Sequence, residues 1–371
     1  MSRIIQIFSL ITLFFTTTVT NAASLSTTVS STKQIPEQYL RGHVLRIIKE
    51  GISQDADALP FQTVEVRLST GKTERINYTA TDKKIKTQKI TPGDEVVVLE
   101  IPSDTHEKST FYITDFYRTP SLGFFALLFI VVVVALGKWR GVSSLFGLGT
   151  TIGVLIWFVI PQILLGHNPV IITLIGAPLI ILLSMYLAHG WKKQTHLSVF
   201  GTILTLICAV LAALGAVTGA RLFGTGSEEA MYVATSSATQ IDLRGVLLAG
   251  IIIGALGVLD DITTAQTATI HEIHDTKPTI KFPELFMRAM RVGREHIASL
   301  VNTLVLAYAG ASFPLFLLFF TTKEQQPLWV VLNSQQISEE IVRTLVGSVT
   351  LILAVPISSA ISAWWYTRKT N

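Results

Sequence analysis

The chain has 371 residues, of which 49% are hydrophobic and only 15% are charged, and its mean hydropathy is +0.52. Soluble globular proteins usually carry about 25% charged residues, so the composition favours a membrane protein. The formal charge of +4 is spread along the chain and forms no basic run suited to a phosphate backbone, so nucleic acid is not a predicted partner. The single cysteine, Cys208, excludes an internal disulfide framework.

The first 38 residues predict export. Residues 1–23 resemble a secretory signal peptide, with Arg3 before the apolar run Ile4–Phe15 and the small-residue exit Asn21-Ala22-Ala23. An uncleaved first anchor is the alternative, but the apolar run is short for a membrane span, which favours cleavage. Residues 24–38 are rich in Ser and Thr and predict a flexible linker.

Residues 39–118 predict a small all-β domain. Alternating hydrophobic runs occur at Val44–Ile48, Thr63–Leu68, Arg75–Tyr78, Val96–Ile101 and Phe111–Phe116. Five short strands in so short a segment favour an OB-like barrel. Thirteen basic and thirteen acidic residues lie between Ser24 and Pro120, and no basic groove with interleaved aromatic residues is visible. We therefore expect this extracytoplasmic domain to be structural or to bind a protein partner.

Residues 119–371 predict an α-helical polytopic membrane domain with about seven transmembrane helices. The charge-poor stretches lie between residues 118 and 138, twice between 140 and 192 (divided at 166–169), and at 193–221, 244–261, 297–320 and 343–368. With the β domain outside, eleven Lys and Arg residues fall in inner loops and four in outer loops. This asymmetry predicts a cytoplasmic C-terminus.

The end of the fifth predicted span combines apolar and acidic residues. An apolar stretch from Gly245 to Leu259 leads directly into Asp260 and Asp261. Each carboxylate costs about 2.5–3.5 kcal/mol at the centre of a membrane helix. The pair is expected to line the cytoplasmic half of a cavity, where it takes up protons or coordinates a cation. The alternative is that it marks the helix end and is solvated there.

A polar stripe continues from this pair. Asp260, Thr264, Thr267, His271 and His274 share one helix face by their spacing. The two histidines are three residues apart, whereas the zinc-binding helix motif needs four. A solvated face is therefore favoured, and neither a metal site nor a cofactor is predicted.

Two predicted spans contain helix-breaking segments. Gly176 and Pro178 lie in the third span, and Gly310 and Pro314 in the sixth. Paired broken helices mark the binding sites of many transporters. Pro161 and Pro356 also lie within spans, so kinks are general in this chain.

Three segments resemble signatures of the YibE/F-like family of bacterial multi-pass membrane proteins. They are residues 248–261, which form a glycine-rich run ending in Asp260-Asp261, residues 291–312, and residues 137–141. The resemblance extends over residues 39–366 and implies a protein of the bacterial inner membrane. In the family motif a single Asp at the position of Asp260 is the usual element. The resemblance supplies no catalytic residues.

Two functions remain in competition. The first is a transporter or permease for an unknown small solute or ion, with a polar pathway lined by Asp260, Asp261, Thr264, Asn302, Thr303 and Tyr308. The second is a non-transporting scaffold or export-assembly component, anchored in the lipid bilayer, whose β domain binds an extracytoplasmic protein. An intramembrane enzyme is a third hypothesis, but no Ser/His pair at plausible membrane depth, zinc signature or phosphate-binding loop indicates one.

Overall fold

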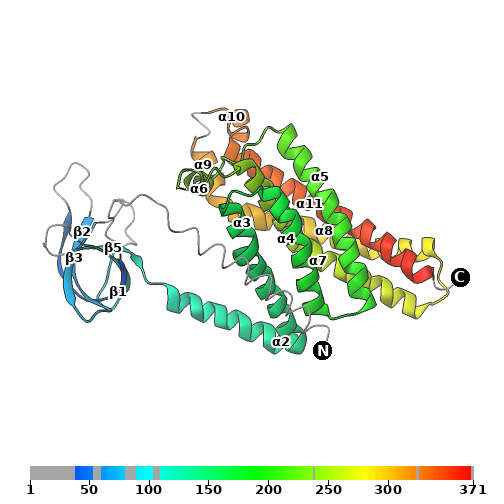
Figure 1. The fold of residues 1–371 in the computed structure, drawn as a ribbon, viewed down its shortest axis with the longest axis horizontal. Coiled ribbons are helices and arrows are strands. Elements are labelled where there is room, and N and C mark those ends of the chain that lie inside the picture. Colours follow the sequence, from blue (N-terminus) through cyan, green and yellow to red (C-terminus); the bar gives the residue numbers. More distant parts are fainter. Residues whose placement is uncertain are drawn as a thin grey trace. The chain divides into compact units, whose positions relative to one another are not determined.

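The computed structural model describes residues 38–52, 60–79, 89–102, 109–236, 239–322 and 326–368 (Figure 1). The predicted signal peptide and almost all of the predicted linker lie outside these residues. The described residues fall into two compact units, 38–133 and 134–368.

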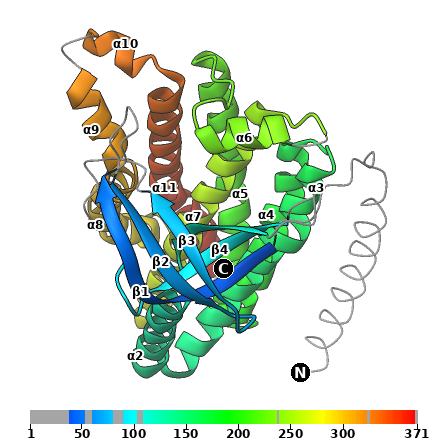
Figure 2. The same ribbon diagram turned by 90° about the vertical axis from the view of Figure 1, so that its left-hand side faces the viewer.

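The first unit contains a five-stranded sheet, which confirms the five predicted strands. Its strands are β1 (Gln38–Ile52), β2 (Pro60–Leu68), β3 (Thr73–Thr79), β4 (Glu95–Ile101) and β5 (Thr110–Phe116). Their order is β3-β2-β1-β4-β5, and all four pairings are antiparallel. The long strand β1 pairs with both β2 and β4. The end strands β3 and β5 contact each other, so the sheet is curled (Figure 2).

The strand alternation predicted from the sequence buries one face of this curled sheet. Its core consists of nine aliphatic residues, among them Val44, Val64 and Val96, which are completely buried. Gln62 fixes the chain before β4, because its side chain donates to the carbonyl of Ile90 (3.0 Å) and accepts from the amide of the same residue (2.8 Å). This satisfies a buried amide that would otherwise be costly.

The second unit is helical. The elements from the start of the helical segment are α2 (Thr119–Val154), the π-helical turn η2 (Leu155–Val159), α3 (Ile160–Leu164), α4 (Pro169–His189), α5 (Lys193–Gly219), α6 (Glu228–Ser236), α7 (Leu243–Thr276), α8 (Phe282–Ala311), α9 (Phe313–Thr322), α10 (Leu328–Leu332) and α11 (Gln335–Thr367). Helix α2 spans the division between the two units and has a non-helical backbone at Lys138.

Five described stretches are long and apolar enough to cross a membrane: 119–164, 169–189, 193–219, 243–276 and 335–367. The first combines two predicted spans across the kink at Lys138. The predicted division at 166–169 lies between α3 and α4. There, Asn168 caps α4 by accepting from the amides of Val170 and Ile171, and Pro169 occupies the first helical turn. The predicted sixth span is divided between α8 and α9 at Ser312.

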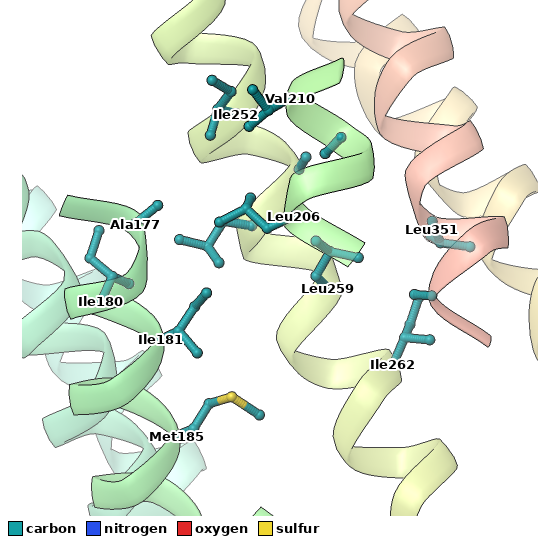
Figure 3. Close-up of a cluster of buried hydrophobic side chains, with 14 of the residues drawn as sticks. Ala177, Ile180, Ile181, Met185, Leu206, Val210, Ile252, Leu259, Ile262 and Leu351 are labelled. Carbon is teal, nitrogen blue, oxygen red and sulfur yellow. The ribbon is translucent and has the colours of Figure 1, made fainter. Parts of the chain in front are cut away.

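Helix α7 is central to the helical unit, since it contacts α4, α5, α8 and α11. The largest apolar cluster lies among these helices. Figure 3 shows Ile181 and Met185 of α4 directed toward Leu206 of α5 and Leu259 of α7. These contacts place the carboxylate that follows Leu259 inside the bundle.

Candidate functional site

Asp260 contacts a polar side chain across the bundle. The hydroxyl of Ser184 on α4 donates to its Oδ2 (3.0 Å). Ser184 lies five residues before the last residue of α4, His189, which corresponds to about 7.5 Å at 1.5 Å per residue. Trp191 and two lysines follow that end of the helix, as is typical of a membrane–water interface. Asp260 therefore lies about one and a half helical turns inside the bundle.

A row of polar contacts continues along α7 from Asp260. The hydroxyls of Thr263 and Thr202 of α5 lie 2.7 Å apart. The amide of Gln266 donates to the hydroxyl of Ser359 on α11 (2.8 Å) and to the carbonyl of Ala289 on α8 (3.0 Å). The polar seam, as we name it, comprises Ser184, Thr202, Asp260, Thr263, Gln266, Thr267, Ser359 and Ser362.

Six members of the polar seam are essentially completely buried: Thr202, Thr263, Gln266, Thr267, Ser359 and Ser362. Thr267 and Ser362 hydrogen-bond to each other, with 3.2 Å between their hydroxyls. Buried polar side chains are costly unless they are hydrogen-bonded. The seam thus joins α4, α5, α8 and α11 to one face of α7.

Some buried oxygens in the helical unit have no hydrogen-bond partner among the described residues. They include Oδ1 of Asp260, Oγ1 of Thr264 and Oε1 of Gln266 on α7, and Oγ of Ser358 on α11. The amide oxygen of Gln266 can only accept a hydrogen bond, and so can the oxygen of Asp260 while its carboxyl group is ionised. Oxygens of these types bind protons or hard cations. Asp260 and Thr264 are separated by one helical turn and share a face.

Glycines bring the helices of the seam close together. A Cβ on Gly201 of α5 would lie 2.9 Å from the hydroxyl oxygen of Ser358 on α11. A Cβ on Gly293 of α8 would overlap Val355 and lie 3.2 Å from the amide nitrogen of Gln266. Small residues allow this kind of close packing between membrane helices.

Not all predicted pathway residues join the seam. Asp261 is exposed, and so are Asn302 and Thr303 on α8. Thr303 donates to the carbonyl of Ser299 within its own helix. Tyr308 is partly buried, and a Cβ on Gly254 of α7 would lie 3.5 Å from its hydroxyl. Asp260 and Thr264 are therefore the two predicted residues that the structure places on the seam face.

The two predicted helix breaks differ. Helix α4 continues through Gly176 and Pro178, which corrects the expectation of an interruption there. Gly176 instead provides room for a neighbour, since a Cβ there would lie 2.7 Å from Val159 of η2. At the second position, the chain leaves α8 after Ala311 and resumes as α9 at Phe313, so Gly310 and Pro314 lie on opposite sides of the break.

A second buried carboxylate lies near the start of α11 and is not among the site residues predicted from the sequence. Glu339 is 6% exposed and accepts from the amide of Gly226 (3.2 Å). One turn earlier, Gln335 accepts from the amide of Phe223 (3.2 Å). Gly224 has a positive φ of 78° and allows the loop to turn over the helix. We name Glu339 and the loop 222–226 the Glu339 cap.

Comparison with known families supports the interpretation of the α7 motif. The family model described as YibE/F-like protein matches residues 125–368, which is more than half of the chain. The chain belongs to the YibE/F-like family. The match includes α7 and α8, which contain the segments that resemble the family's signatures. It does not include the β strands. No curated protein and no solved structure matches the chain. Family membership and the five apolar helices indicate a membrane protein.

Proposed function

We propose that this YibE/F-like protein is a transporter of the bacterial inner membrane that moves a small solute or ion. Asp260 takes up a proton or coordinates a cation on a pathway along the seam face of α7. In this proposal about seven helices cross the membrane, the OB-like β unit is extracytoplasmic and the C-terminus is cytoplasmic. The Lys and Arg asymmetry of the sequence supports that orientation.

The observation that carries the proposal is the incomplete hydrogen bonding of Asp260. One of its oxygens accepts from Ser184, and the other is buried with no partner among the described residues. An ionised carboxylate in that position is unfavourable by a few kcal/mol, on the order of 2.5–3.5 on insertion scales. Binding a proton or a cation removes this penalty, so the site favours an occupant of positive charge.

Two further features support movement of the helices around this site. The break at Ser312 separates α8 from α9 and makes this part of the bundle a discontinuous helix. The hydroxyl of Tyr308 lies near two glycines, Gly254 of α7 and Gly347 of α11, where a Cβ would lie 3.5 and 3.8 Å away. Backbones without side chains at this contact allow α8 to shift against α7 and α11.

The test is ion flux in proteoliposomes, measured with a pH-sensitive dye under an imposed proton gradient and with a sodium-sensitive dye under an imposed sodium gradient. Asp260→Asn keeps the shape of the side chain and an oxygen for Ser184 but removes the charge. Asp261→Asn is the matched control, because it removes the same charge from an exposed neighbour.

Transport predicts wild-type flux above that of empty vesicles, a loss of at least about tenfold in Asp260→Asn, and little change in Asp261→Asn. Equal flux in wild type and Asp260→Asn would reject the role of Asp260. Flux no greater than in empty vesicles under either gradient would reject coupling to both ions.

A row of three side chains across the β sheet, Tyr39, Leu99 and Tyr112, favours the second candidate. That candidate is a scaffold whose β unit binds an extracytoplasmic protein. Tyr39 of β1 and Tyr112 of β5 both pair with Leu99 of β4. Residues directly opposite each other in a sheet point to the same face. The two tyrosines are 63% and 48% exposed, and exposed tyrosines are enriched at protein interfaces.

A scaffold predicts that Tyr39→Ser/Tyr112→Ser reduces the size of the complex that the full chain forms in native membranes, as measured by native electrophoresis. It also predicts that Asp260→Asn leaves this size unchanged. An unchanged complex in the tyrosine variant would contradict a scaffold that uses this row.

A further inference from the structure

Two adjoining grooves lie where α5 begins and where α7 and α11 end. The basic groove has a volume of about 640 Å³, and its lining includes Lys192, Lys193, His271, His274 and Tyr366. The apolar groove has a volume of about 770 Å³, and its lining includes Leu197, Phe200, Phe282, Ile361 and Trp364. Both grooves are lined by Lys193 and Trp365. The two grooves therefore adjoin each other at these residues.

The basic groove carries net positive charge. Lys192 and Lys193 are exposed and make no ion pair with any residue that the structure describes. One carboxylate, Asp275, also lines the groove and lies 3.4 Å from Nδ1 of His271 and 3.8 Å from Nδ1 of His274. Its side chain is 60% exposed, so it offsets one of the two lysine charges and leaves an excess.

A hydrogen-bonding group in the same groove lacks a partner. Nε2 of His274 is buried and has no hydrogen-bond partner within the described residues. The imidazole rings of His271 and His274 lie 5.4 and 5.2 Å from the ring of Tyr366, centroid to centroid, which fixes their orientation. His274 lines the same groove as Lys192 and Lys193, and an imidazole N–H together with two ammonium groups suits a phosphate group.

The apolar groove is formed by side chains from three helices, with Leu197 and Phe200 on α5, Phe282 on α8, and Ile361 and Trp364 on α11. Phe200 and Trp364 are 59% and 51% exposed. Arg368 lies over the ring of Trp364, with 4.9 Å between its Cζ and the ring centroid. The groove is thus apolar along its length and cationic at its rim.

We propose that the two grooves form one binding site for an anionic phospholipid. The phosphate lies between Lys192, Lys193 and His274, and an acyl chain lies against Phe200 and Ile361. The bilayer supplies this ligand directly, and basic pockets between membrane helices are suited to acidic headgroups. A charged head next to an apolar groove matches an amphiphile better than a free anion, which would leave the apolar groove uncovered.

The experiment titrates the purified full-length protein in detergent with phosphatidylglycerol or phosphatidylcholine and counts bound lipids by native mass spectrometry. The test variants are Lys192→Gln/Lys193→Gln for the headgroup and Phe200→Ser for the chain. The matched control is Arg291→Gln/Arg294→Gln, which removes two positive charges from exposed positions of α8 that line neither groove. Thermal unfolding confirms that every variant is folded.

The expected result is preference for phosphatidylglycerol over phosphatidylcholine and about thirty-fold weaker phosphatidylglycerol binding in the lysine variant. Phe200→Ser weakens the binding of both lipids, and the arginine control binds like wild type. Equal binding of the two lipids, or no effect of the lysine variant, would overturn the proposal. Displacement of phosphatidylglycerol by inorganic phosphate at equal concentration would also overturn it, in favour of a site for soluble anions.

Discussion

The polar seam and the Glu339 cap each contain a carboxylate of the helical unit, but the two carboxylates differ in their hydrogen bonding. Glu339 accepts a backbone hydrogen bond from a loop that folds over it. Among the described residues, its carboxylate has no buried oxygen that lacks a hydrogen-bond partner. Asp260 accepts from Ser184 with one oxygen, and its other oxygen is buried without a described partner. A satisfied carboxylate holds structure together, whereas an incompletely satisfied one is available to bind a proton or a cation.

The largest expected effect on stability comes from the cap. Glu339→Ala leaves the amide of Gly226 without its acceptor beneath the loop, and we expect a loss of about 2–3 kcal/mol in the free energy of unfolding. Thermal unfolding of the purified protein in detergent measures it. Glu339→Gln is the control, because its amide oxygen can still accept from Gly226, and it should lose less than half as much. Wild-type stability in Glu339→Ala would contradict the structural role of Glu339.

On the seam face of α7, a side chain that donates hydrogen bonds to neighbouring helices should also differ from one that has no described partner. Gln266→Leu removes the donor to Ser359 and to the carbonyl of Ala289, and it should destabilise the protein by about 1–3 kcal/mol. Thr264→Val replaces a buried hydroxyl that has no described partner with a methyl group of similar size. Its stability should stay within about 0.5 kcal/mol of wild type. Equal losses in the two variants, measured by thermal unfolding, would show that the hydrogen bonds of Gln266 are not what stabilises the seam.

The smallest effect is expected at an exposed carboxylate. The pKa of Glu284 lies below its ordinary value of 4.5, first because Lys277 donates a hydrogen bond to it and carries a positive charge. The charge and the hydrogen bond of Arg288 lower this pKa further. A lowered pKa means that Glu284 contributes stability above the ordinary pKa and loses it as the pH falls through the folded-state pKa. Glu284→Gln should therefore unfold at a slightly lower temperature than wild type at pH 7. This difference should vanish in acid below the folded-state pKa, and a difference that persists there would contradict the ion-pair origin.

The sequence predicted the parts of the fold that follow from local pattern. The five strands, the division between α3 and α4, and the position of Asp260 at the end of an apolar run could all be predicted, because alternation, capping residues and charge placement are local signals. The interruption at Pro178 was predicted wrongly, since a membrane helix tolerates a proline when its neighbours pack around it.

The Glu339 cap could not be predicted from local pattern. Glu339 lies in the polar segment Gln335–Glu340 at the start of a helix, which is typical of a solvated end. Its burial comes from a loop more than a hundred residues earlier in the chain. The same reason applies to Gln266, whose partners on α8 and α11 are 23 and 93 residues away. Long-range packing decides which polar residues are buried, and the local pattern of the sequence does not contain it.

The most direct test of the central claim measures flux and stability together in Asp260→Asn and Glu339→Gln. Flux is expressed per folded molecule in proteoliposomes, under the proton and the sodium gradient. We predict that Asp260→Asn loses at least about tenfold in flux while its unfolding temperature stays within about 2 °C of wild type. Glu339→Gln should lower the unfolding temperature and keep wild-type flux. The opposite pattern, with stability lost in Asp260→Asn and flux lost in Glu339→Gln, would contradict the distinction between a binding carboxylate and a structural one.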